Sequence, residues 1–242
     1  MRRLVLWDVD GTLVFYGGIG RQAFADAFLA IAGRPAAEVA STMIKTAGRT
    51  DPEIALEFLA MHGIADGEAQ LESFNAALVE ALATKASLLR KNGQLLPGVR
   101  EALAAVRRQP GVVQSLLTGN LEANAVLKLA TFGLEGYVDF EVGAYGSDHR
   151  DRSRLVEVAR AKAAAKYGVD VDPGAVVVIG DTPLDVAAGR AGGARVVAVA
   201  TGHYDVEALR ATGPDVVLAD LRDTDATLRA ILSPEPPAPT KR

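Results

Sequence analysis

Five short apolar runs along the chain predict the strands of a β-sheet. They cover residues 4–7, 112–117, 176–179, 196–199 and 216–218. Runs that are apolar throughout are typical of parallel strands that are buried on both faces. Segments with helical periodicity separate most of these runs, as in repeated strand–helix–strand units. The sequence therefore predicts an α/β fold in which helices cover both faces of a parallel sheet.

The long gap between the first two runs contains helical patterns and no convincing strand. Apolar residues spaced three and four apart predict three helices there: one around residues 24–31, one that begins with Asp51 as its cap and ends near Gly63, and one around residues 71–82. One helix is enough to connect neighbouring parallel strands, so the extra helices indicate an all-helical cap domain inserted after the first strand.

These patterns predict how the chain divides into domains. Residues 1–16 and 97–232 would form the core, and residues 17–96 would form the helical cap. Residues 233–242 are rich in proline, which is incompatible with a regular helix or sheet. We expect these last residues to be a disordered tail.

The composition is that of a soluble globular protein. The chain has 242 residues, of which 49% are hydrophobic and 23% are charged, with a net charge of −4. This balance gives no electrostatic reason to expect nucleic acid or a membrane as a partner. The absence of cysteine excludes disulfides, thiolate metal sites and a cysteine nucleophile. The N-terminus does not resemble a signal peptide, so we expect a cytoplasmic protein. The sequence leaves the oligomeric state open.

Two carboxylates directly follow the first apolar run. Asp8 and Asp10 are two residues apart, so an extended backbone would point both to one side and Val9 to the other. Open α/β sheets bind ligands at the carboxyl ends of their strands. Two close acids need a proton or a cation between them, which suggests either a general acid beside a nucleophile or a Mg²⁺ site. The alternative is an ordinary turn, since Asp and Gly11 are both common in turns.

Polar residues also follow the second run. Thr118, Gly119 and Asn120 come directly before a segment with helical periodicity. A hydroxyl and free N–H groups at the start of a helix form an anion site. Threonine and asparagine are equally good helix caps, so a purely structural role is the alternative.

A further carboxylate, Asp181, follows the run at residues 176–179. It lies where a third acidic ligand could reach a cation shared with Asp8. Thr182 and Asp185 have the spacing of a capping box around Pro183 at the first helical position, so Asp185 also has a structural explanation. A cap does not explain Asp181, because Thr182 already occupies that place.

Arginines provide candidate cations outside these motifs. Arg150, Arg152 and Arg154 precede a helix that begins near residue 155, and a cation is needed if a phosphate is to share a site with several carboxylates. Most clusters of this kind are solvated surface, so each arginine taken singly has a structural explanation. In the inserted segment, Arg49 could reach the cleft and meet a substrate carboxylate or phosphate, or lie exposed on a loop. His203 lies near the same sheet edge.

The three strand-end motifs, in this order and with a helical insertion after the first, resemble those of the haloacid dehalogenase-like hydrolase superfamily, in its phosphoglycolate phosphatase-like branch. Residues 8–12 are similar to the first motif of the family, residues 117–120 to the second and residues 180–185 to the fourth. The third motif is usually a lysine before a late helix, and no lysine occupies that position here. Arg152 is our choice for its role, and Arg154 is the second choice.

The resemblance implies a Rossmann-like core with a mobile cap, and it implies a role for each motif. Asp8 would attack phosphorus to form an aspartyl phosphate, and Asp10 would protonate the leaving alcohol and then activate water. Mg²⁺ would be held by the Asp8 carboxylate, the Asp10 backbone carbonyl and Asp181. The other expected site residues would hold phosphate oxygens (Thr118 and Arg152), bind substrate (Gly119, Asn120 and Arg49) or support the site (Thr12, Thr182 and Asp185).

The acid at position 10 favours phosphoryl transfer, because the dehalogenases of the family lack an acid two residues after the nucleophile. The resemblance therefore predicts an Mg²⁺-dependent phosphatase, similar to phosphoglycolate phosphatases, that acts on a small-molecule phosphate ester. Two alternatives remain, namely an isomerase similar to β-phosphoglucomutase and a non-catalytic binding protein of the same fold. The sequence does not identify the substrate.

Overall fold

The computed structural model describes residues 1–36 and 44–233, and in these ranges it contains a five-stranded sheet of order β4-β1-β5-β6-β7. All neighbouring strands in this sheet are parallel. The strands are β1 (Arg3–Trp7), β4 (Val112–Leu116), β5 (Val176–Gly180), β6 (Arg195–Val199) and β7 (Val216–Leu218). They match the five predicted runs to within one residue at each end. The predicted parallel α/β fold is therefore confirmed.

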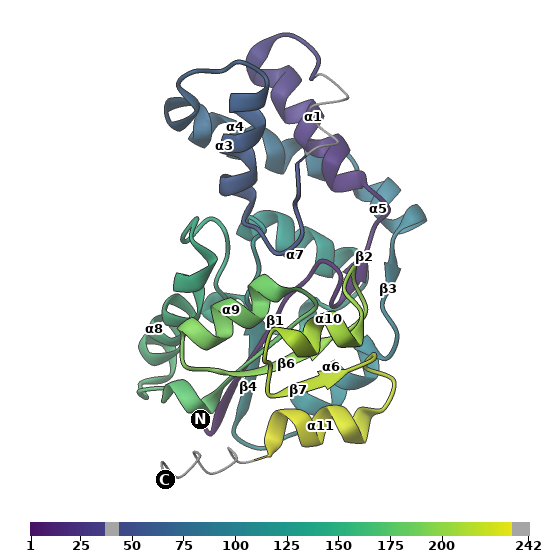
Figure 1. Cartoon of the computed structure of the whole chain (residues 1–242), viewed down its shortest axis with the longest axis vertical. Helices are drawn as coiled ribbons and strands as arrows, with labels where there is room; N and C mark the ends of the chain where they lie inside the picture. The colour runs from purple at the N-terminus through teal and green to yellow at the C-terminus, as the bar shows by residue number, and fades with distance from the viewer. Residues whose placement is uncertain (37–43, 234–242) are drawn as a thin grey trace.

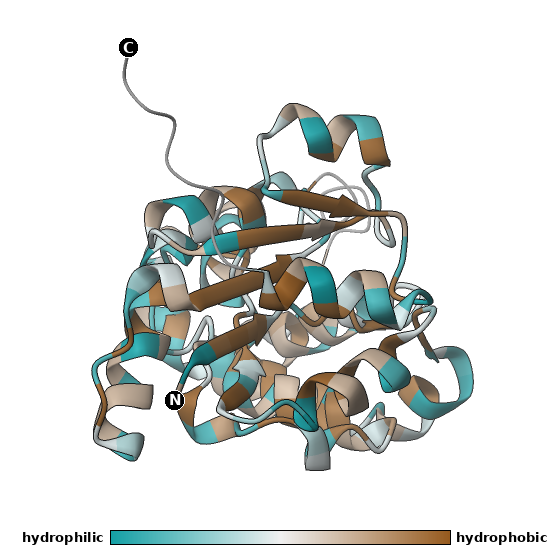
Figure 2. Cartoon of the chain, turned by 90° about the horizontal axis from the view of Figure 1, so that it is seen from below, coloured by the Kyte–Doolittle hydropathy of each residue, from teal (hydrophilic) through white to brown (hydrophobic). Residues whose placement is uncertain are grey.

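Alternate residues of the central strand β1 pack on opposite faces of the sheet. Val5 and Trp7 are fully buried in a cluster that includes side chains of α6 (Val99–Arg107) and α11 (Thr224–Leu232). Leu4 and Leu6 are fully buried in a second cluster, with side chains of α8 (Leu155–Tyr167). A strand covered on both faces must be apolar at every position, which explains its continuous apolar sequence. Figure 2 shows the strands as hydrophobic arrows with mixed helices around them.

The remaining core helices follow individual strands. They are α7 (Glu122–Thr131), α9 (Pro183–Ala191) and α10 (Val206–Ala211), with short 3₁₀ turns at η1 (Glu135–Tyr137), η2 (Phe140–Val142), η3 (Arg152–Arg154) and η4 (Pro173–Ala175). The strand order places β1 between β4 and β5, so the chain passes over β1 on its way from β4 to β5. A change of direction of this kind creates a crevice at the carboxyl ends of the strands.

A group of helices lies at one end of the molecule, away from the sheet (Figure 1). These helices are α1 (Ile19–Ala32), α3 (Asp51–Met61), α4 (Gly67–Ala83) and α5 (Ala86–Asn92). Phe24, Phe28, Phe58 and Phe74 join α1, α3 and α4 through ring contacts between 5.7 and 6.1 Å. The three predicted helices are present, and α5 is a fourth that the sequence analysis missed. The cap of α3 is Thr50 rather than Asp51, because the Thr50 hydroxyl accepts the Glu53 N–H.

Two very short strands connect the helical group to the core. β2 (Val14–Phe15) pairs antiparallel with β3 (Gln94–Leu95), so the expectation of no strand in residues 17–96 was wrong. The division into a core of residues 1–16 and 97–232 and a cap of residues 17–96 stays a prediction. Most of the predicted tail, residues 234–242, lies outside the described residues. In the part of the chain that the structure describes, every helix is too short or too polar to cross a membrane.

Candidate active site

The three predicted motifs meet at the carboxyl edge of the sheet. They follow β1, β4 and β5, which are neighbours in the sheet, so the loops after these strands lie side by side. A cavity of about 450 Å³ opens above this edge, between the sheet and the helical group. Asp8, Asp10, Thr118, Arg152 and Asp181 all line it.

Asp8 is held between a cation and other acids. Its side chain is buried, and its Oδ1 accepts a hydrogen bond from Arg152 Nη2 at 2.8 Å. Its Oδ2 accepts no hydrogen bond from the described residues, and Asp8 lines the cavity. Burial, followed by the charge of Asp185, raises the pKa of Asp8 to about 7 against the opposing effect of Arg152. One oxygen of Asp8 is therefore fixed by the protein and the other is available.

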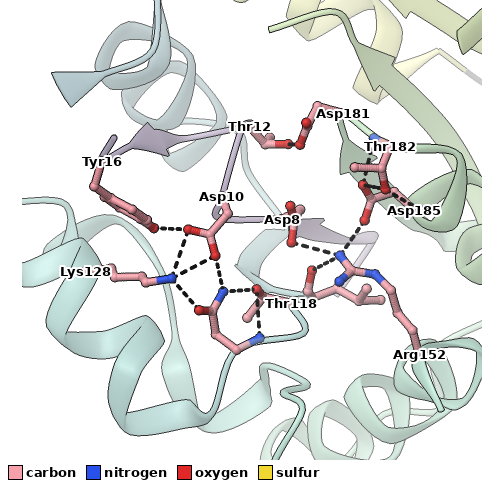
Figure 3. A network of polar contacts seen from close by, with 12 residues as sticks. Asp8, Asp10, Thr12, Tyr16, Thr118, Lys128, Arg152, Asp181, Thr182 and Asp185 are labelled. Carbon is pink, nitrogen blue, oxygen red and sulfur yellow. Dashed lines mark hydrogen bonds and ion pairs between the residues drawn. The ribbon is translucent and has the colours of Figure 1, made fainter. Parts of the chain in front are cut away.

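Arg152 and Arg154 lie in very different surroundings, although both belong to η3. Arg152 is only 7% exposed and binds both Asp8, which directly follows β1, and Asp185, in the first turn of α9 (Figure 3). The side chain of Arg154 is 57% exposed and pairs at 2.9 Å with Glu157 of the following helix α8. The structure brings Arg152 to the motifs and leaves Arg154 at the surface.

Asp10 has a separate set of partners from Asp8. Lys128 Nζ donates to both of its carboxylate oxygens, at 2.9 and 2.8 Å, and the Tyr16 hydroxyl donates to Oδ1. Asn120 Nδ2 donates to Oδ2 at 2.7 Å. Burial alone would raise the pKa of Asp10, but the charge and hydrogen bonds of Lys128, with Tyr16 and Asn120, lower it overall. These contacts fix the carboxylate in one orientation (Figure 3).

Asp181 completes a cluster of buried carboxylates. Asp8, Asp181 and Asp185 have oxygens that lie within 4.8 Å of one another, close enough to share a cation. Thr12 donates to Asp181 Oδ1 at 2.9 Å, while Oδ2 accepts no hydrogen bond from the described residues. A Cβ on Gly11 would lie 2.4 Å from Oδ2, so this residue must be glycine for the loop to pass so close. Burial and the charge of Asp8 raise the pKa of Asp181 to about 8.

Asp185 combines the structural and the electrostatic role that the sequence left open. Its Oδ2 accepts the Thr182 N–H at 3.0 Å and the Thr182 hydroxyl at 2.7 Å, and its own N–H donates back to Thr182 Oγ1 at 3.2 Å. This is the capping box predicted at the start of α9. Its Oδ1 binds Arg152, so the cap also holds the arginine that reaches Asp8.

The loop after β4 orients other groups through its side chains. Asn120 Nδ2 donates to Thr118 Oγ1 at 2.7 Å as well as to Asp10, so the amide connects the first and second motifs. The Gly119 carbonyl accepts the Asp51 N–H at 2.7 Å, and a Cβ on Gly119 would lie 2.0 Å from the Arg49 carbonyl oxygen. Gly119 therefore allows the helical group to contact the core at this point.

Arg49 lines the cavity, but its charge is already paired. Its Nε lies 2.8 Å from Glu53, and Nη1 binds Glu57, both on α3. The sequence analysis expected Arg49 to bind substrate in the cleft, whereas here the guanidinium binds carboxylates of the helix that follows it. His203 also lines the cavity.

Lys128 and Tyr16 were missed by the sequence analysis, although both bind Asp10. A signal for Lys128 is present, because Asn124 and Lys128 are four apart and so lie on one side of α7, and Asn120 lies four positions earlier, just before the helix. Lys128 is only 5% exposed and also binds Asn120 Oδ1. Tyr16 follows the first motif without any such periodicity.

Known proteins resemble the chain over most of its length. It is 35% identical to the plasmid phosphoglycolate phosphatase of Cupriavidus necator over 147 residues, which are 61% of this chain and 59% of that protein. It is 29% identical to phosphoglycolate phosphatase 1 of Pseudomonas aeruginosa over 225 residues, 91% of this chain and 78% of that protein. The chain thus spans less than two thirds of the first relative and more than two thirds of the second.

Solved structures share the fold. A predicted phosphoglycolate phosphatase from Haemophilus somnus matches with a TM-score of 0.66 at 18% identity, over 93% of this chain and 97% of that one. A Thermotoga maritima protein assigned as a β-phosphoglucomutase matches with a TM-score of 0.60 at 24% identity, over 95% of this chain and all of that one. At these identities the likeness concerns the fold alone.

The model of one protein family matches most of the chain. The family is described as haloacid dehalogenase-like hydrolase, and the match covers residues 5–190, which include all three strand-end motifs. This match confirms the family resemblance drawn from the motifs. The chain belongs to the haloacid dehalogenase-like hydrolase family.

Proposed function

We propose that the protein hydrolyses phosphate monoesters of small molecules through a phosphorylated Asp8. The observation that carries this proposal is that Asp8 lines the cavity, with one oxygen held by Arg152 and the other without a hydrogen bond from the described residues. A carboxylate that a cation holds at the lining of a cavity is well placed to attack a ligand bound there. The phosphatases among the relatives support the same reaction.

The residues suggest two steps. In the first, which begins with Asp10 protonated and Asp8 ionised, Asp8 Oδ2 forms a bond to phosphorus, the bond from phosphorus to the alcohol oxygen breaks, and Asp10 gives its proton to that oxygen. In the second, water attacks phosphorus, Asp10 takes the proton of the water, and phosphate leaves as the Asp8 carboxylate is restored. Thr118 and Arg152 would hold the remaining phosphate oxygens during both steps.

The buried carboxylates fit a divalent metal ion. Asp8 and Asp181 each leave one oxygen without a hydrogen bond from the described residues, and carboxylate oxygens are the ligands that Mg²⁺ prefers. Asp8, Asp181 and the Asp10 backbone carbonyl would hold the ion, with Asp185 beside them. When bound, Mg²⁺ neutralises charge that collects around the phosphoryl group.

A panel of phosphate monoesters assayed with Mg²⁺ tests the proposal. Repeated turnovers that release inorganic phosphate would support it. Conversion of a sugar phosphate to its isomer without phosphate release would instead indicate a phosphoryl-transfer isomerase. Tight binding without hydrolysis of any ester, activated aryl phosphates included, would indicate a non-catalytic binding protein.

We expect activity to require Mg²⁺ and to be lost in chelator. Asp181→Ala should weaken the affinity for Mg²⁺ more than the affinity for substrate.

Because the pKa values of Asp8 and Asp181 are raised to about 7 and about 8, Mg²⁺ must displace protons below these values, and its affinity should increase with pH. Titration calorimetry with Mg²⁺ at several pH values measures this. Ca²⁺ should inhibit, because its looser coordination would misplace Asp8. Full activity in chelator would contradict the metal proposal.

Arg152→Ala is expected to lower kcat/KM by about 10²-fold or more, the effect of losing one fixed electrostatic donor. The matched control is Arg154→Ala, which removes an exposed ion pair on the same turn and should be nearly neutral. Because loss of a buried cation also destabilises the fold, Arg152→Lys is the second variant, and it should recover part of the rate. A larger loss in Arg154→Ala than in Arg152→Ala would move the role to Arg154.

A further inference from the structure

The two sides of the cavity differ in chemistry. The sheet side carries the charged residues of the motifs. The opposite side is formed by the helical group and is apolar, with Phe24 on α1, Ile54 and Phe58 on α3, and Ile44 before α3. When a phosphate ester binds with its phosphate beside Asp8, the alcohol part has to extend toward this apolar side, because the phosphate occupies the sheet side.

The cations around the cavity are largely committed to protein carboxylates. Arg152 binds Asp8 and Asp185, and Lys128 binds Asp10. On the apolar side, Arg49 is neutralised by Glu53 and Glu57. The lining residue Arg21 pairs with no carboxylate of residues 1–36 and 44–233, and it is exposed to solvent rather than enclosed with the apolar side chains.

An acid at the edge of the apolar side disfavours a second negative charge on the ligand. Asp51 lines the cavity at the start of α3, and its carboxylate accepts the Leu121 N–H at 2.9 Å. It contributes one more negative charge to a cavity that the acids of the sheet side already line. A ligand carboxylate placed here would meet a like charge, which costs binding energy.

From this contrast we infer, on the basis of the proposed phosphatase function, that the substrate is a phosphate monoester of an uncharged and largely apolar alcohol. The leaving group would pack against Ile54 and the rings of Phe24 and Phe58. The volume of about 450 Å³ lies in the range of pockets that enclose small organic ligands. Phosphoglycolate, which carries a carboxylate on its leaving group, would be a poor substrate for this chain, although two relatives are phosphoglycolate phosphatases.

A series of straight-chain alkyl phosphates tests the inference. The pKa of the leaving alcohol is nearly constant along the series, so differences in kcat/KM report the packing of the chain. From ethyl to hexyl phosphate, we expect kcat/KM to increase by about threefold to fourfold for each methylene, which corresponds to full burial of that group. Phosphoglycolate should be hydrolysed at least about tenfold less efficiently than ethyl phosphate.

Two variants on one helix separate the cavity wall from general packing. Ile54→Ala removes methyl groups from the wall, whereas Leu59→Ala removes a similar volume from α3 where it does not line the cavity. Both should lower the melting temperature. Only Ile54→Ala should reduce the gain per methylene, to about twofold or less, and Leu59→Ala should leave it unchanged.

The outcomes distinguish this inference from the function on which it rests. A flat alkyl series, or a preference for phosphoglycolate over ethyl phosphate, would overturn the apolar leaving group and leave the phosphatase intact. If Ile54→Ala and Leu59→Ala reduce the increase in kcat/KM per methylene equally, the cavity wall does not select the substrate. That result would also overturn the inference. Hydrolysis of no ester, including p-nitrophenyl phosphate, would overturn both proposals.

Discussion

Asp8→Asn is expected to abolish turnover and to leave the fold intact. The amide has nearly the shape of the carboxylate, but it has no anionic oxygen to attack phosphorus. We expect kcat to decrease by at least about 10⁴-fold, the scale on which enzymes lose rate when a covalent nucleophile is removed. Steady-state hydrolysis of an activated aryl phosphate measures this, after mass spectrometry has shown that the asparagine has not deamidated. Residual activity above about one hundredth of wild type would contradict the assignment.

The same substitution has a readout that is independent of turnover. Burial and Asp185 raise the pKa of Asp8 from 3.8 to about 7, so in this pH window the folded, metal-free protein keeps a proton that the unfolded chain releases. The free energy of unfolding therefore decreases as the pH rises through the window. The introduced amide cannot titrate, so Asp8→Asn should show a smaller decrease. Urea unfolding in chelator at both ends of the window tests this, and equal decreases would mean that Asp8 is ionised throughout.

The strands and the main helices could be predicted because their burial leaves a continuous pattern in the sequence. β1 and β5 are apolar at nearly every position because helices cover both faces of the sheet. The short elements leave no such pattern. α5 buries only Leu89, and β2 and β3 have two residues each, which is too few for any periodicity to be visible.

The placement of the motif residues could be predicted because parallel strands end at one edge of the sheet. The partners of those residues were harder to predict, because they depend on where distant helices lie. Lys128 reaches Asp10 across 118 positions of sequence, and Arg152 reaches Asp8 across 144. Arg152 was found because it comes just before a helix near the motifs, whereas Lys128 lies inside a helix, where a lysine is ordinarily a surface residue.

Two different cations hold the neighbouring acids Asp8 and Asp10 in separate surroundings. The sequence suggested that the two carboxylates share one small space. In the structure, Asp8 binds Arg152 and Asp10 binds Lys128, and the pKa of Asp8 is raised whereas that of Asp10 is lowered. Both shifts belong to the metal-free protein, so Asp8 must lose its proton before it attacks, as on binding Mg²⁺, and Asp10 must gain one before it protonates the leaving oxygen. Lys128 therefore belongs with the motif residues in any account of this site.

Asp10→Asn is expected to lower kcat by about 10² to 10⁴-fold, the usual contribution of a positioned proton-transfer group. The loss should be larger for alkyl phosphates, whose leaving oxygen needs a proton, than for aryl phosphates, whose leaving oxygen is stable without one. A series of leaving groups, assayed with wild type and variant, measures this difference. Equal losses for both classes of ester would contradict the proton-transfer role.

The loss in Asp10→Asn could have a second cause, since Lys128 would keep its charge without its carboxylate partner. A buried cation in that state would move and displace the loop that carries Asn120. The double variant Asp10→Asn with Lys128→Met removes the charge together with its partner and preserves side-chain length. If Asp10 transfers protons, the double variant stays as slow as Asp10→Asn and keeps its preference for aryl phosphates. Recovery of alkyl phosphate hydrolysis in the double variant would show that Asp10 acts only by holding Lys128 in place.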